Sequence, residues 1–323
     1  MSFDPPTENA AWSPRGRPTL AELERRCQKP DHRALGTWMA RRVSRPLALR
    51  VTWVVLPWGI SAHAATVAAW LCAVLAAASF AAGTVDAWLA AIALLQLWYL
   101  LDHVDGQLAR WRGTASLDGV QLDYLMHHTV NLLVPLGIGY GLAASPLQGV
   151  SLALGLVWGL SLLLIGLVND TRYKAFIERL KSLDGELLVI GGAGREPSQA
   201  PSLRRGPLGA AWWLARKACE IHVVMNALTC LALARWLAAM WLAGDVGLDG
   251  SRAYLAAMAL VSSATALTVI VRSVRCEQAE REFVTWYRVP EGRELAFTAG
   301  RWKVEEWEPH DHPSSAVDRP LIS

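Results

Sequence analysis

Six long apolar segments dominate this 323-residue sequence and restrict what it can fold into. In chain order they cover residues 64–85, 87–101, 124–148, 149–168, 221–243 and 253–271. A helix of about 20 apolar residues crosses a bilayer core about 30 Å thick. Only 18% of the residues are charged, against about a quarter in soluble domains. The expected fold class is therefore all-α: a polytopic membrane protein with six transmembrane helices.

The second apolar segment is too short to span a bilayer by itself. It meets Asp102, and Asp105 and Arg110 follow within the next turns. We expect the helix to continue through these residues, with its charged end in the headgroup region or in a water-filled cavity.

Basic residues mark one side of the expected membrane domain. Arginines and lysines crowd the N-terminal segment, the second and fourth connections, and the segment after the sixth span, whereas the other connections are almost free of them. The positive-inside rule places both termini in the cytoplasm, in a plasma or inner membrane. A shorter apolar stretch at residues 47–60 is expected to form an interfacial helix before the first span.

The expected organisation has three parts. Residues 1–46 form a basic cytoplasmic segment, residues 47–275 the six-helix membrane domain, and residues 276–323 a polar cytoplasmic tail. The sequence does not decide whether this tail is folded.

A cluster of polar residues joins the second span to the third. Asp102 and Asp105 are three residues apart, so they share a face of one helix. Asp123 and His127 are four apart and share a face of the next helix. If the two helices pack antiparallel, the three carboxylates converge beside the small residues Gly106 and Ala109.

Converging carboxylates at membrane depth need a compensating charge. Oxygen ligands favour Mg²⁺ or Mn²⁺, usually shared with substrate phosphates. The alternative is a set of helix-end charges in the headgroup layer. Intramembrane carboxylates more often mark a functional site, so we favour the metal.

The cluster resembles the signature of the CDP-alcohol phosphatidyltransferase family, D-x2-D-G-x2-A-R-x8-G-x3-D-x3-D. Seven residues stand at the required spacings: Asp102, Asp105, Gly106, Ala109, Arg110, Gly119 and Asp123. The resemblance extends over roughly residues 40–275 and implies six helices with cytoplasmic termini.

This resemblance implies an activity and a set of roles. Such an enzyme transfers a phosphatidyl or other phospho-alcohol group from a CDP-linked donor to an acceptor alcohol and releases CMP, as in phospholipid biosynthesis. By the same resemblance, Asp102, Asp105 and Asp123 hold the metal on the diphosphate. Gly106 and Ala109 leave room for the nucleotide, and the remaining motif residues, Arg110 and Gly119, belong to the same cofactor-binding set.

Two positions depart from the family pattern. His127 replaces the last aspartate, the residue commonly assigned as the base. It is a general base, a fourth metal ligand that favours a softer metal, or the mark of a chain that has lost catalysis. At the start of the first span the usual Pro-Asn-x-x-Thr is reduced to Thr66, with His63 as one possible replacement.

Further polar residues suggest weaker sites. Arg172, Lys174 and Arg275 flank the fourth and sixth spans and would form a pocket for an acceptor phosphate, unless they serve only topology. Arg235 is expected to extend toward the outer interface. Gly155 and Gly159 form a GxxxG pair, a signal for helix packing or a homodimer.

Three functions remain open at this point. The first is the metal-dependent transferase. The second is a catalytically silent protein of the same fold that binds a nucleotide or lipid, and the third is a small cation-coupled transporter. The carboxylates lie at the end of a span rather than at its middle, which disfavours transport. The expected partners are a CDP-linked donor, an acceptor alcohol of unknown identity and membrane lipids, with no nucleic acid.

Overall fold

The computed structural model describes residues 18–28, 37–143, 148–189, 206–241, 246–298 and 300–306. Most of these residues are helical. The helices are α1 (Leu20–Cys27), α2 (Arg45–Val55), α3 (Ala62–Ala81), α4 (Val85–Arg112), α5 (Leu117–Gly141), α6 (Gln148–Lys181), α7 (Gly206–Ala218), α8 (Ile221–Trp241), α9 (Val246–Arg275) and α10 (Gln278–Trp286). A π-helical turn (Ala40–Ser44) precedes α2, and a 3-10 turn (Leu56–Trp58) follows it.

The chain divides into two compact units. The first contains Met1–Gly166 and Gln199–Thr268, and the second contains Leu167–Ser198 and Val269–Ser323. Both α6 and α9 therefore begin in the first unit and end in the second.

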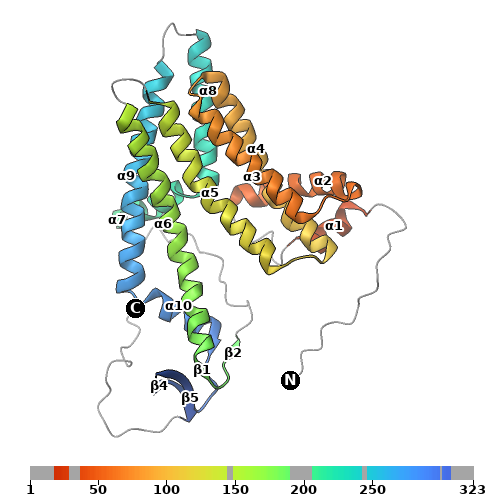
Figure 1. The fold of residues 1–323 in the computed structure, drawn as a ribbon, viewed down its shortest axis with the longest axis vertical. Coiled ribbons are helices and arrows are strands. Elements are labelled where there is room, and N and C mark those ends of the chain that lie inside the picture. The colour runs from red at the N-terminus through yellow and green to blue at the C-terminus, as the bar shows by residue number, and fades with distance from the viewer. Residues whose placement is uncertain are drawn as a thin grey trace. The chain divides into compact units, whose positions relative to one another are not determined.

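Three helices, α3, α4 and α5, form the centre of the first unit, and α4 runs antiparallel to the other two (Figure 1). Hydroxyl side chains begin each of them: Ser61, Thr84 and Ser116 accept a hydrogen bond from a backbone N–H three residues later. Gly113 ends α4 with φ of 64°, a left-handed conformation that favours glycine. The predicted extension of the second span through the charged residues is confirmed, because α4 runs without a break to Arg112.

Glycines bring the backbones of α3, α5 and α6 into contact. A Cβ atom added to Gly137 would lie 2.3 Å from the carbonyl oxygen of Ala77 in α3. On another face of α5, a Cβ on Gly139 would lie 2.6 Å from the carbonyl oxygen of Ser151 in α6. Close contact through small residues is the usual way in which membrane helices pack.

Both glycines of the predicted GxxxG pair take part in this packing. A Cβ on Gly155 would meet the carbonyl oxygen of Pro135 at 2.5 Å, and one on Gly159 would meet that of Leu132 at 2.9 Å. The pair therefore serves contact within the chain, between α5 and α6.

Arg235 of α8 is buried, with 4% of its surface exposed, so the prediction that it extends to the interface is wrong. Its Nη2 atom donates to the carbonyl of Gly83, in the turn between α3 and α4, at 3.1 Å. Its guanidinium carbon lies 4.6 Å from the centre of the Trp88 ring. The Gly83 carbonyl and the Trp88 face compensate the charge, so the side chain need not reach water.

Five helices in the described ranges are long and apolar enough to cross a membrane. They are Ala62–Ala81, Val85–Arg112, Gly149–Lys181, Ile221–Trp241 and Asp249–Arg275. This confirms a mostly helical, multi-pass protein. A sixth span would be α5, whose first turns carry polar residues, and the count of six stays a prediction. The apolar segment predicted at residues 124–148 also ends early as a helix, at Gly141.

The second unit contains short strands, so the fold is mostly helical rather than all-α. The strands are β1 (Leu183–Asp184), β2 (Leu188–Val189), β3 (Tyr287–Arg288), β4 (Arg293–Thr298) and β5 (Arg301–Glu306). β4 and β5 form an antiparallel hairpin, β1 pairs with β5 in parallel, and β2 pairs with β3. The segment after the sixth span, which the sequence left undecided, is therefore folded at least up to Glu306.

Candidate active site

The motif residues line one cavity of about 470 Å³ at the end of the first unit where α4 meets α5. All seven matching positions and His127 contribute to its wall. A short turn joins α4 to α5, and residues from the last turns of α4 and the first turns of α5 line the same cavity. The Gly119 N–H donates to the Ser116 hydroxyl at 3.1 Å, which fixes the start of α5.

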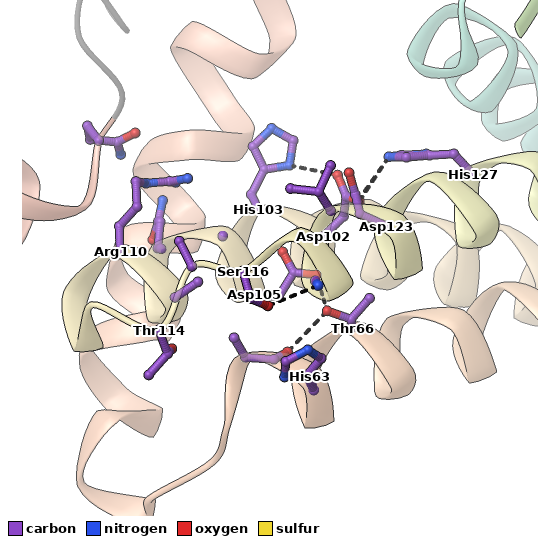
Figure 2. Close-up of a pocket in the computed structure, with 18 of the residues that line it drawn as sticks. His63, Thr66, Asp102, His103, Asp105, Arg110, Thr114, Ser116, Asp123 and His127 are labelled. Atoms are coloured by element: carbon purple, nitrogen blue, oxygen red, sulfur yellow. Dashed lines mark hydrogen bonds and ion pairs between the residues drawn. The ribbon is translucent and has the colours of Figure 1, made fainter. Parts of the chain in front are cut away.

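Asp102, Asp123 and His127 form a compact cluster in this cavity. The Nε2 atom of His127 lies 3.2 Å from Oδ1 of Asp102 and 3.5 Å from Oδ1 of Asp123. One ligand atom from each residue lies within 4.8 Å of the others. Figure 2 shows the imidazole and both carboxylates turned toward one another.

This cluster has the donor set for one divalent cation. Two carboxylate oxygens and an imidazole nitrogen suit Mn²⁺ and other first-row metals. Asp102 Oδ1 is buried and receives no aligned hydrogen bond among the described residues, even though Nε2 is near. A buried carboxylate oxygen in this state is a common feature of a site built for a further ligand.

Asp105 lines the same cavity but is bonded elsewhere. Its Oδ2 atom accepts a hydrogen bond of 2.7 Å from the Thr66 hydroxyl of α3, and only 8% of its surface is exposed. The predicted convergence therefore brings together Asp102, Asp123 and His127, while Asp105 stands one turn along α4 beside α3 (Figure 2).

The glycines of the motif are surrounded by side-chain atoms rather than by backbone. A Cβ on Gly106 would lie 3.1 Å from the Arg110 guanidinium, and one on Gly119 would lie 3.3 Å from the Ser116 hydroxyl and 3.8 Å from Nε2 of His63. Arg110 itself donates through Nε to the backbone carbonyl of Cys27, the last residue of α1. The N-terminal helix is thus joined to the motif by a hydrogen bond that sequence spacing does not show.

His103 is a site residue that the sequence analysis missed. Its Nδ1 atom lies 2.9 Å from the Tyr99 carbonyl oxygen and 3.8 Å from Oδ2 of Asp102. Next to Asp102 in the chain, it points about 100° away on the helix, and no signal in the sequence set it apart. The Trp98 ring lies edge-on to His127, with the ring centres 5.7 Å apart.

Three other polar residues, His128, Glu220 and Asn226, lie outside this cavity. His128 packs against Gly166 of α6. Glu220 of the segment before α8 pairs with Lys217 at 2.7 Å, and Asn226 lies 3.5 Å from Gln96. These polar residues are used in packing between and within helices.

The three predicted acceptor-phosphate residues, Arg172, Lys174 and Arg275, belong to the second unit. Arg172 forms an ion pair with Glu282 of α10, and its Nη2 donates to Asn169 at 2.8 Å. The cavity around the motif is lined by first-unit residues only.

Comparisons with known proteins agree with the motif. Residues 60–177 match the family model of the CDP-alcohol phosphatidyltransferases. No curated protein is significantly similar in sequence. A crystal structure of the phosphatidylinositol phosphate synthase of Mycobacterium tuberculosis in complex with manganese and citrate is similar at 15% identity and a TM-score of 0.44, covering 69% of this chain and 88% of that one. The same enzyme with CDP-DAG bound is similar at 15% identity and a TM-score of 0.43, covering 71% and 94%.

The family match covers α3, α4, α5 and most of α6, and it contains every residue of the signature. The resemblance expected from the motif is confirmed. The similarity to the CDP-alcohol phosphatidyltransferase family is therefore found over residues 60–177.

Proposed function

We propose that this protein is a membrane-embedded, metal-dependent transferase that moves a phosphatidyl or phospho-alcohol group from a CDP-linked donor to an acceptor alcohol. The observation that carries the proposal is the cluster of Asp102, Asp123 and His127 in a cavity that the rest of the motif also lines. The family of residues 60–177 supports the reaction class.

Asp102 and Asp123 would hold the divalent metal through carboxylate oxygens, with His127 as a nitrogen ligand. When bound, Mg²⁺ or Mn²⁺ neutralises charge on the diphosphate and on the departing CMP. Because imidazole is a softer ligand than a fourth carboxylate, we expect Mn²⁺ to bind at least as tightly as Mg²⁺.

In the reaction, the acceptor hydroxyl oxygen forms a bond to the donor phosphorus that carries the alcohol group. The bond from this phosphorus to the oxygen of CMP breaks, CMP leaves, and the hydroxyl proton must pass to a base. His127 acts as this base only when Nε2 is not held by a metal. The 3.2 and 3.5 Å separations from two carboxylates support a role as ligand or as a cationic partner more than a role as base.

The same separations support a second candidate, a silent nucleotide- or lipid-binding protein. A charged imidazole between two carboxylates supplies the compensation that a metal would otherwise give. Such a chain would bind CDP-linked molecules without turning them over.

Measurement of CMP release separates these candidates. The purified full chain in nanodiscs is given CDP-diacylglycerol, Mn²⁺ or Mg²⁺, and a panel of acceptor alcohols. The transferase predicts metal-dependent release that Asp102→Ala abolishes and that Asp86→Ala, at the far end of the same helix, leaves unchanged. Release only from His127→Asp would identify a site silenced at one position. No release from either protein, with CDP still bound, would contradict the transferase for this donor.

We also propose the finer topology. α5 is the sixth span, both termini are cytoplasmic, residues 1–46 and 276–323 flank the membrane domain at 47–275, and residues 47–60 contain an interfacial helix. The proposal also includes Arg172, Lys174 and Arg275 as an acceptor-phosphate group, and a homodimer as the assembly. Labelling of single cysteines placed in each connection, from either side of sealed vesicles, tests the six-span arrangement.

A further inference from the structure

A second cavity of about 660 Å³ lies between α1 and α2, outside the segment that matches the family. Its wall contains four arginines and one glutamate: Arg41, Arg42, Arg45, Arg50 and Glu24. We refer to it as the arginine pocket. Its volume is within the range of ligand sites, about 300–1,000 Å³.

The arrangement of the arginines differs from a general basic surface. Arg41 and Arg45 are four residues apart on the turn that leads into α2, so they share the face toward α1, with Arg42 beside them. By contrast, Arg25 and Arg26 of α1 are exposed and do not line the pocket. Basic residues that serve only topology need no common face.

The wall formed by α1 is packed against α2. Leu23 and Cys27 of α1 are fully buried against Leu49 of α2, and the Trp53 indole donates to the carbonyl of Pro18 at 2.8 Å. Figure 1 shows α1 beside α2. The pocket is therefore formed by packed helices rather than by loose side chains.

The backbone at Arg45 is hydrogen-bonded to α4. Its backbone carbonyl accepts a bond of 3.4 Å from Gln107 of α4, whose Oε1 accepts one of 2.8 Å from Thr52. Partial burial lowers the pKa of the Arg45 guanidinium; Tyr99 opposes this change, and the like charge of Arg41 adds to it. An anion in the pocket would offset both the burial and the repulsion.

We propose that the arginine pocket binds the phosphate group of a phosphate ester through Arg41, Arg42 and Arg45. Guanidinium groups match the oxygens of phosphate in bidentate pairs. Leu20, Ala21, Pro46 and Leu49 supply an apolar wall for the organic part of the ester. The bound group lies next to the acidic cavity, because Gln28 and Arg45 line both. The proposal does not depend on the transfer reaction, since binding needs no turnover.

Two kinds of ligand contain such a phosphate group: a soluble phosphate ester and an anionic lipid headgroup. The first arm of the test titrates inorganic phosphate into the full chain in detergent, at about 0.15 M salt, where long-range fields are screened beyond about 8 Å. The second arm uses native mass spectrometry to count bound phosphatidic acid against phosphatidylcholine.

Both arms compare the parent chain with Arg41→Gln/Arg42→Gln and with Arg25→Gln/Arg26→Gln, which removes the same charge outside the pocket. We expect the first pair to weaken binding about tenfold or more and the second to change it less than about twofold. If Arg41→Gln/Arg42→Gln weakens binding of inorganic phosphate, the pocket recognises the phosphate group alone. If it weakens only the binding of phosphatidic acid, the pocket recognises the lipid headgroup. Arg41→Lys/Arg42→Lys, which keeps the charge, should retain part of the binding and shows that the site still folds. Equal losses from both glutamine pairs, or no loss in either arm, would overturn the proposal.

Discussion

The two ends of the α3–α4–α5 bundle use glycine in opposite ways. At the end where α3 turns into α4, a Cβ on Gly141 would lie 2.0 Å from the carbonyl oxygen of Phe80, and one on Gly83 would lie 2.4 Å from that of Gly141. At the other end, Gly106 and Gly119 border the cavity of about 470 Å³. A Cβ at the first end, which we call the closed end, would meet backbone atoms, whereas a Cβ at the cavity end, which we call the open end, would meet the ends of polar side chains.

This difference indicates that one end of the three helices contributes mainly to stability and the other mainly to ligand binding. At the closed end, a larger side chain would collide with backbone atoms, and these cannot move aside as the end of a flexible side chain can. At the open end, the nearest atoms to Gly106 belong to the end of the Arg110 side chain rather than to backbone. Substitutions at the closed end should therefore affect folding, and those at the open end should affect ligand binding.

The largest effect is expected at the closed end from Gly141→Leu. The new side chain would collide with the Phe80 carbonyl, and we expect more than about 3 kcal/mol of destabilisation, or no folded protein. Thermal unfolding in detergent, followed by gel filtration, measures it. Gly149→Leu is the matched control, because a Cβ there has no neighbour within 4 Å. Equal stability of the two variants would remove the distinction between the ends.

A smaller effect on the same end is expected from Arg235→Met. The change removes the bond to the Gly83 carbonyl and the contact with Trp88, at a cost of about 1–3 kcal/mol. Unfolding in denaturant measures the change in free energy. Arg252→Met, which removes a more exposed arginine paired with Asp249, should cost less than about 1 kcal/mol. If Arg252→Met lowered the free energy of unfolding more than Arg235→Met does, the buried contacts of Arg235 would contribute little to stability.

The smallest effect on stability is expected from Gly106→Ala at the open end. Alanine favours the helix over glycine by up to about 1 kcal/mol, so the variant should be as stable as the parent or slightly more so. The added methyl displaces the Arg110 guanidinium and enters the cavity, so CDP binding should weaken several-fold. Calorimetric titration with CDP and a thermal melt together test this. A destabilised variant with unchanged binding would reverse the assignment of the two ends.

The sequence alone predicted what depends on short-range spacing. Asp102 and Asp105 on one helix, Asp123 and His127 on the next, the continuation of α4 through Arg110 and the resemblance to the family all follow from residue types a few positions apart. Helical geometry converts such spacings directly into shared faces, so no knowledge of the fold is needed.

Only the tertiary structure decided which faces meet. In the structure, Asp102 contacts His127, and Asp105 accepts a hydrogen bond from Thr66. Arg235 is buried against Trp88, and Gly155 packs against α5 of the same chain. Arg45 lines both cavities. These partners lie tens to more than a hundred residues apart in the sequence. Contacts of that kind depend on how whole helices pack, and a period of 3.6 residues per turn carries no information about the neighbouring helix.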